Sequence, residues 1–263
     1  MSARQETSAP SEVVLTEARG ETLVITIHRP HRRNALTRDV ADGLRTALAE
    51  LDDSPRLRAG VVTGSGDHFC AGMDLRDTPL DEEIDDFERT FQRILADPAE
   101  KPLIAAIEGY AVAGGWELAL ACDLVVASET AKFGLPEVKV GLVAQGGALL
   151  ELPRRIPYHL AMELSLTGAI VGAARVAEVG AINALCAQGT ALQTALALAD
   201  EVTANAPLAV VATKKVVKNA HGWPVEEQWQ RQEEIASPVF HSADAAEGAK
   251  AFAEKRPPRW QGR

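Results

Sequence analysis

Two glutamates stand in apolar surroundings and could serve as a general acid and a general base. Glu117 lies in the run WELALAC, and Glu137 lies in the run FGLPEV. A buried glutamate is rare unless it is paired or functional, because burial disfavours the charged form. Burial also suits a carboxyl group to proton transfer near neutral pH. For each glutamate taken singly, a solvent-facing position or an arginine partner is the alternative.

Two glycine-containing turns could present backbone amides to a ligand. In HFCAGMDL, Gly72 permits a sharp turn that exposes the amide of Met73. In GYAVAGGWE, Gly114 and the glycine after it precede a helix, whose first amides are unpaired. Fixed donors of this kind stabilise an oxyanion. A plain tight turn and close helix–strand packing are the alternatives. Neither segment is a Walker phosphate loop or a dinucleotide-binding fingerprint.

Alternating strands and helices position these segments. We expect strands at 22–28, 59–63, 103–107 and 123–127, and helices from 37 to 52, at 81–97 and at 116–122. Such alternation predicts mostly parallel pairing covered by helices. From residue 158 onward the pattern is helical without a convincing strand, and helices open at Pro207, Pro224 and Ser242. The prediction is an α/β core followed by a helical C-terminal region.

Composition excludes several classes of protein. The chain has 263 residues, 46% of them hydrophobic and 24% charged, so it is not disordered as a whole. Its net charge of -10 argues against a nucleic-acid-binding surface. Three cysteines without a CxxC pair favour neither a disulfide framework nor a structural zinc site. The most apolar stretch, 109–128, carries two carboxylates, which a membrane span would not. We therefore expect a cytoplasmic protein with no metal and no membrane partner.

Taken in order, the motifs resemble the crotonase superfamily of enoyl-CoA hydratases and isomerases. The resemblance rests on FCAGMDL, GYAVAGGWELALACDLVVAS and AKFGLPEVKVGLVAQGG, and continues through NAPLAVVATKK to AFAEKRPPRW. It covers residues 12 to 263. It implies a crotonase-like ββα spiral core at 12–200, a flexible N-terminus at 1–11 and a helical trimerisation region at 201–263.

The resemblance also implies an active site and a reaction. The amides of Met73 and Gly114 would form an oxyanion hole for a thioester carbonyl. Glu117 and Glu137 would flank one water and add it to the C2=C3 bond of a 2-enoyl-CoA. Coenzyme A would be part of the substrate, so that no separate cofactor is expected.

The family's coenzyme A contacts and assembly carry over by position. The residues concerned are Arg32, Arg33, Ala71, Asp74, Phe252 and Lys255. The last two lie in the final helix, which often reaches the site of a neighbouring subunit in a trimer or a dimer of trimers. Solvated surface charge is the alternative for Arg32, Arg33 and Lys255, and core packing is the alternative for Phe252.

Departures from the family pattern leave other readings open. Met73 and Trp116 are larger than the residues usual at these positions of the family. The loop at 141–147 lacks the proline that is common in the family. Within this loop, Gln145 is either a plain loop residue or a substrate contact. A double-bond isomerase or another enolate chemistry needs only one glutamate, so the pair favours hydration. A non-catalytic acyl-CoA-binding protein is a third interpretation. Such a protein would be expected to lack one of the two glutamates.

Overall fold

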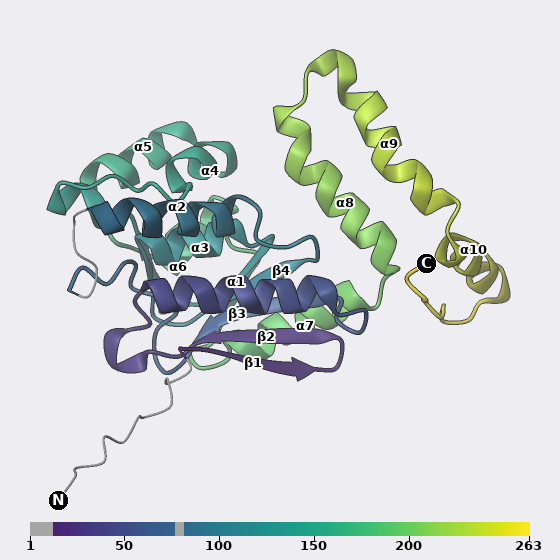
Figure 1. The fold of residues 1–263 in the computed structure, drawn as a ribbon, viewed down its shortest axis with the longest axis horizontal. Helices are drawn as coiled ribbons and strands as arrows, with labels where there is room; N and C mark the ends of the chain where they lie inside the picture. The colour runs from purple at the N-terminus through teal and green to yellow at the C-terminus, as the bar shows by residue number, and fades with distance from the viewer. Residues whose placement is uncertain (1–12, 77–81) are drawn as a thin grey trace, which may run out of the picture.

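A six-stranded sheet forms the centre of the molecule, as a computed structural model of residues 13–76 and 82–263 shows (Figure 1). The predicted flexible N-terminus at 1–11 lies outside these described residues. The strand order is β1-β2-β3-β4-β6-β9. The strands are β1 Val14–Arg19, β2 Thr22–Ile27, β3 Ala59–Gly64, β4 Leu103–Ile107, β6 Leu124–Ser128 and β9 Ala184–Cys186. All neighbours from β2 to β9 pair in parallel, as predicted, and β1 adds an antiparallel edge.

Both faces of this sheet are buried, which explains why its inner strands are continuous apolar runs. Alternate residues such as Val61 and Ile104 pack against α7 (Ala191–Thr203). Their neighbours Val62 and Ala105 face the larger core on the other side. The period of two along each strand thus divides the residues between two hydrophobic layers.

Helices α1 and α2 supply much of the larger layer. Helix α1 (Arg38–Asp53) is capped by Thr37, whose side chain accepts a hydrogen bond from Val40 N, and its predicted apolar stripe is buried. Helix α2 (Glu82–Ala96) buries Phe87, Phe91, Ile94 and Leu95, as its spacing predicted. The side chain of Ile84, the first residue of that predicted stripe, lies outside the described part.

A small second sheet positions the candidate site. It has the order β5-β7-β8, with β5 Tyr110–Val112, β7 Lys132–Gly134 and β8 Val171–Gly172. Helix α3 (Gly114–Ala121) follows β5, and the 3-10 helix η2 (Pro136–Val140) follows β7. Because β5 and β7 are parallel neighbours, both segments leave the same end of this sheet. Helices α4 (Ala148–Arg155), α5 (Tyr158–Thr167) and α6 (Ala173–Glu178) come next.

Short strands account for the differences from the predicted pattern. The expectation of no strand after residue 158 is wrong, because β8 and β9 lie there. Two or three residues are too few to show a period, so only tertiary pairing reveals such strands. The strand β1 was not predicted either. Helix α3 begins at Gly114, two residues before the predicted start, since its glycines belong to the first turn.

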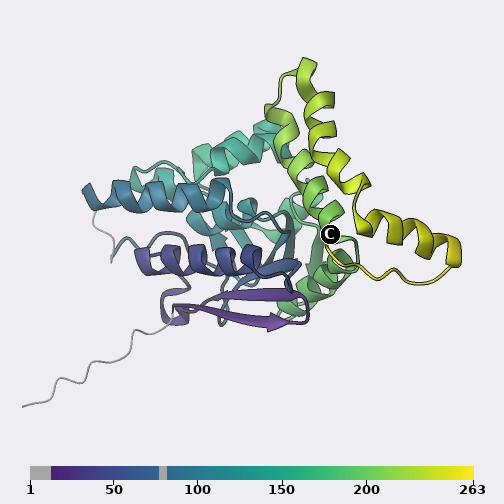
Figure 2. The same ribbon diagram turned by 45° about the vertical axis from the view of Figure 1, so that its right-hand side comes forward.

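The last three helices extend away from the sheet as an arm. Helix α8 (Pro207–Asn219) leads through the 3-10 helices η3 (Ala220–Gly222) and η4 (Val225–Glu227) to α9 (Gln228–Phe240) and α10 (Ala243–Glu254). Figure 1 shows the arm standing apart from α4 and α5, and Figure 2 shows α10 projecting from the body at the end of the arm. Helices α8 and α9 bury none of their residues. We call residues 207–254 the C-terminal arm.

Few contacts hold this arm to the body. Lys214 of α8 pairs with Asp123 at 2.7 Å, and Lys218 pairs with Asp97 at 2.8 Å. The Trp260 indole in the closing segment donates to Ala204 O at 2.8 Å.

No single described helix is long and apolar enough to cross a membrane. Only α7 and the segment from α8 through η3 reach that length together, and they are bent by 107°.

Lys214→Met should loosen the arm while leaving the sheet intact. The lost bond is charge-assisted and largely buried, because the Lys214 side chain is only 10% exposed, so about 1.5–3 kcal/mol of local stability depends on it. Hydrogen exchange should show α8 amides opening at least about tenfold more often, with β3 and β4 unchanged. Lys218→Met is the matched control, because its partner Asp97 is 87% exposed and such pairs contribute little. Equal effects of the two variants would contradict this anchor.

Candidate functional site

The first glutamate is held at the beginning of a helix. Glu117 lies in the first turn of α3 and is only 5% exposed, which excludes the solvent-facing alternative. Its Oε1 accepts a hydrogen bond from Ala148 N at 3.3 Å. Ala148 is the first residue of α4, where the helix dipole stabilises negative charge. The carboxylate is therefore fixed by backbone from a different part of the chain.

The backbone of Gly146 passes close beside this carboxylate. A Cβ atom on Gly146 would lie 2.5 Å from Glu117 Oε2 and 2.9 Å from Leu95 Cδ1. Either contact is too close for an ordinary Cβ, so a side chain here would displace Glu117 or the loop. The sequence analysis did not assign Gly146 any role. Its only signal was the Gly-Gly step before a helix.

The second glutamate faces the same cavity. Glu137 lies in the first turn of η2, is half-buried and has its Oε2 fully buried. Glu117, Glu137, Met73 and Gly114 all line one cavity of about 700 Å³. The structure therefore brings together the four residues that the sequence analysis named as catalytic. Two carboxylates in one cavity fit proton transfer to and from a bound molecule.

The amide of Met73 is turned toward this cavity by local pairing. Met73 forms a parallel bridge with Leu36, in which Leu36 N donates to Gly72 O at 2.8 Å and Asp74 N donates to Leu36 O at 2.9 Å. In this pairing the amide of the residue between the two bonds points away from Leu36. That orientation leaves the Met73 N–H directed to the cavity side.

Close packing places Gly72 directly beside Gly114. A Cβ atom on Gly72 would lie 2.6 Å from Ala113 Cβ and 3.3 Å from Gly114 N, and Gly72 has φ +85°. Ala113 itself has φ 51°, an uncommon conformation for a residue with a side chain. Gly114 is the first residue of α3, so its N–H lies at the helix N-terminus. The Met73 turn and the first residue of α3 thus lie side by side in the wall of the cavity.

A buried thiol supports the first of these turns. Cys70 Sγ accepts a hydrogen bond from Gly72 N at 3.4 Å. Burial raises the pKa of the Cys70 thiol to about 12, and burial likewise raises the pKa of Cys122 to about 12. Both thiols are therefore protonated at neutral pH, and Cys70 is a packing residue rather than a nucleophile.

The cavity wall is mostly apolar, with a few polar groups. The other described lining residues are Leu36, Ala71, Leu75, Phe87, Arg89, Phe91, Gln92, Ala113, Pro136, Lys139, Val140, Leu142, Val143, Ala144, Gln145 and Gly146. Met73 contributes its side chain to this wall, and Gln145 is both a loop residue and a lining residue. Trp116 instead packs edge-to-face on Phe133 in the core, with the ring centroids 5.8 Å apart, and it is not among the described lining residues.

The predicted coenzyme A residues divide into two groups. Ala71 lines the cavity, and its N–H donates to Arg33 O at 3.0 Å, so the basic turn lies next to the cavity edge. Arg32 is half-buried in the 3-10 helix η1 (Pro30–Arg32), while Arg33 is exposed and its guanidinium lies 5.8 Å from the ring centroid of Tyr110. Neither arginine is among the described residues that line the cavity.

Phe252 and Lys255 lie elsewhere. Phe252 is 88% exposed on α10, and Lys255 caps the end of that helix with φ 53°. Helix α10 lies at the outer end of the arm, apart from α3 and α4 (Figures 1 and 2). Neither residue is among the described residues that line this chain's own cavity.

The Asp74 side chain forms hydrogen bonds and an ion pair within the protein. Its carboxylate is buried and pairs with Arg29 Nη1 at 3.1 Å, while the same nitrogen donates to Ala35 O at 2.7 Å. Asp74 Oδ1 also accepts from Arg76 N. These bonds fix the turn that carries Met73. The side chain is not among the described lining residues, so its role here is to hold the turn.

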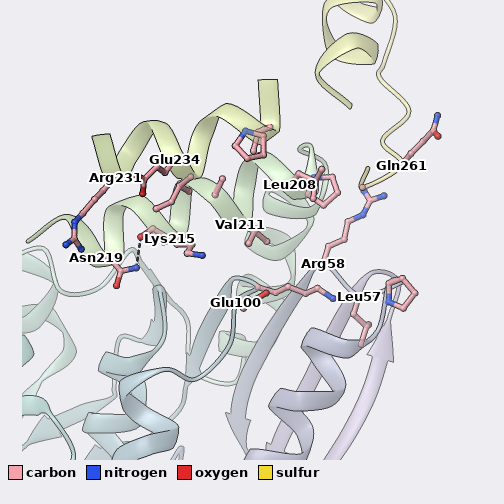
Figure 3. Close-up of a pocket in the computed structure, with 18 of the residues that line it drawn as sticks. Leu57, Arg58, Glu100, Leu208, Val211, Lys215, Asn219, Arg231, Glu234 and Gln261 are labelled. Carbon is pink, nitrogen blue, oxygen red and sulfur yellow. Dashed lines mark hydrogen bonds between the residues drawn. The ribbon is translucent and has the colours of Figure 1, made fainter. Parts of the chain in front are cut away.

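A second and larger cleft, of about 950 Å³, lies between the arm and the body (Figure 3). Leu208, Val211 and Lys215 come from α8, Arg231 and Glu234 come from α9, and Leu57, Arg58 and Glu100 come from the body. None of the predicted site residues is among those described around it. Among the described residues of the whole chain, no group of three or more His, Cys, Asp or Glu could hold a metal ion.

Comparisons with known proteins agree with this geometry. Residues 17–263 match the family model described as enoyl-CoA hydratase/isomerase. The enoyl-CoA hydratase EchA19 of Mycobacterium tuberculosis is 41% identical over 256 residues, 95% of this chain and 96% of that protein. Carnitinyl-CoA dehydratase of Salmonella heidelberg is 37% identical over 261 residues, 96% of this chain and 100% of that protein. The crystal structure of enoyl-CoA hydratase EchA1 from Mycobacterium marinum has a TM-score of 0.89 at 48% identity, over 96% of this chain and 100% of that one.

Asp74→Asn should lower stability rather than ligand affinity. Removing one partner of a buried ion pair leaves the other charge uncompensated, which typically costs about 3–5 kcal/mol. Urea unfolding should show a lower midpoint with an unchanged slope. Asp67→Asn is the control, because Asp67 is exposed on a neighbouring turn. A normal midpoint together with weaker coenzyme A binding would instead make Asp74 a ligand contact.

Proposed function

The chain belongs to the enoyl-CoA hydratase/isomerase family and is an enoyl-CoA hydratase-like enzyme, a hydro-lyase of crotonase fold, and from this premise we propose how its residues divide the reaction. The substrate is a 2-enoyl-CoA thioester, to which water is added reversibly across C2=C3. One observation carries the proposal. Both glutamates and both turn residues, Met73 and Gly114, line the same cavity.

The amides of Met73 and Gly114 bind the thioester oxygen. Two fixed donors draw electron density from the conjugated double bond, so that C3 becomes electrophilic. As charge moves to the oxygen, bonds to the preorganised amides strengthen without rearrangement of the protein. Loss of one such donor typically costs about 3–4 kcal/mol of transition-state stabilisation. The helix dipole of α3 adds to the effect at Gly114.

The two glutamates move the protons. Glu117, ionised at the N-terminus of α4, takes a proton from the attacking water as its oxygen bonds to C3. Glu137 in its protonated form then delivers its proton to C2 of the enolate-like intermediate, and proton exchange of the two carboxyl groups with solvent restores the starting state. In the reverse direction the roles exchange. The cavity needs no separate cofactor for these steps, and coenzyme A remains part of the substrate.

Double-bond isomerisation within the same site is the alternative chemistry. It needs one carboxylate that moves a proton between C2 and C4, with the same oxyanion hole. The second glutamate in the cavity favours hydration. The presence of both glutamates likewise disfavours a non-catalytic acyl-CoA-binding protein.

The C-terminal arm supports the predicted assembly into a trimer or a dimer of trimers. Helices α8 and α9 bury none of their residues, and Trp229, Phe240 and Phe252 are exposed along the arm. Exposed aromatic side chains on unpartnered helices need another surface. In the proposed assembly, Phe252 and Lys255 reach a neighbour's coenzyme A while Arg32 and Arg33 hold the phosphates in their own subunit. The buried protonated thiols support a reducing, cytoplasmic location.

Glu137→Gln should abolish hydration while preserving the fold. Glutamine keeps the shape but has no proton to give, and acid–base help is worth about 10²–10⁴-fold. Loss of the conjugated-thioester absorbance measures the rate. Glu129→Gln, on the exposed loop after β6, is the control. If the variant keeps more than a tenth of the wild-type rate, Glu137 is not the acid.

Gly146→Ala should impair the reaction by displacing Glu117. The added Cβ would meet the carboxylate at 2.5 Å, and a misplacement of about 1 Å typically costs about 10²-fold in rate. We expect kcat to fall by that order. Gly222→Ala is the control, because nothing lies within 4 Å of its added Cβ. If the Gly146→Ala enzyme stays active, the loop moves to accommodate the added Cβ and Glu117 keeps its position.

A further inference from the structure

We propose that this enzyme prefers enoyl-CoA thioesters whose acyl chain is apolar and extends well beyond four carbons. The inference rests on the proposed hydratase function and concerns the same cavity. It follows from where the apolar lining residues lie, and from the charges beside them.

The reacting carbons occupy the deep part of the cavity. Gly114 and Glu117 are buried there, and so are the apolar side chains of Leu36 and Phe91. A four-carbon acyl group bound to the two amides has one carbon beyond C3. It would therefore contact this deep part and nothing further out.

The outer part of the cavity is apolar as well, but exposed. Leu75 is 47% exposed, Val140 is 61% exposed and Val143 is 59% exposed, and all three line the cavity. They come from different segments, since Leu75 follows the Met73 turn, Val140 ends η2 and Val143 lies in the next loop. Apolar groups gathered around one opening favour an apolar occupant, because each buried methylene contributes about 0.8 kcal/mol.

The charges of the described lining favour an uncharged acyl chain over a cationic one. Arg89 and Lys139 are the described cations of the lining, and both are exposed. The described lining carboxylates are Glu117 and Glu137, which the reaction uses at C2 and C3. A trimethylammonium group further along the chain would meet the cations and the apolar residues. This argues against the substrate type named for the carnitinyl-CoA dehydratase relatives.

A substrate panel tests the preference. The trans-2-enoyl-CoAs of four, six, eight and ten carbons, a ten-carbon chain with a terminal carboxylate, and crotonobetainyl-CoA are hydrated by the wild-type enzyme in parallel. We expect kcat/KM to rise at least about tenfold from four to ten carbons, mainly through KM, because remote apolar contacts are made equally in ground and transition states. A flat profile, or a faster reaction with the cationic or carboxylated chain, would overturn the inference.

A double variant tests the residues. Val140→Ser with Val143→Ser should lower the ten-carbon to four-carbon ratio of kcat/KM about tenfold, by raising KM for the longer chain. Val138→Ser is the matched control; Val138 lies on the same short helix, is exposed and is not among the described lining residues. An unchanged ten-carbon to four-carbon ratio of kcat/KM in the double variant would overturn the inference, whether or not the mass of the assembly in solution changes. The two valines would then belong to another surface.

Failure of this inference differs from failure of the proposed function. If every chain is hydrated at a similar rate, the hydratase assignment stands and the preference is wrong. If no chain is hydrated by a folded enzyme that binds them, the hydratase assignment itself is wrong.

Discussion

The contact between the Glu117 carboxylate and the first turn of α4 is the constraint on which the site depends. It joins a helix that starts at residue 114 to one that starts at residue 148. A buried carboxylate is costly unless fixed donors surround it. Here the donor is backbone, which no side-chain substitution removes. The loop that leads into α4 passes close to the carboxylate, so that a Cβ atom on Gly146 would lie 2.5 Å from Glu117 Oε2.

Close packing of backbone against backbone also positions the turn that carries Met73 and the start of α3. Gly72 abuts Ala113 and Gly114, while Leu36 pairs with Met73 from the other side. Buried hydrogen bonds of Asp74 and Arg29 then fix the turn from beneath. The amide positions are thus determined by packing between three chain segments. The Met73 side chain remains available to shape the acyl cavity without disturbing the donor.

Sequence patterns predicted most of the core and the residues that meet in the cavity. Continuous apolar runs predicted β3 and β4, the four-residue spacing predicted the buried face of α1, and two glutamates in apolar runs both line the cavity. The strands β8 and β9 could not be predicted from the sequence, because only their pairing with other strands defines them. The role of Gly146 was equally hidden, since it depends on a contact 29 positions away along the chain. The contacts of Asp74 were equally hidden, because its ion pair with Arg29 joins positions 45 residues apart.

The division between body and arm has a consequence for biosynthesis. Every strand of both sheets and every residue of the acid–base pair and the donor pair precedes residue 187. As the chain is synthesised from its N-terminus, the strands and the residues of the cavity leave the ribosome before the arm does. The arm then emerges with its aromatic side chains uncovered. The arm is therefore the part of the chain that most favours aggregation as long as these side chains stay uncovered.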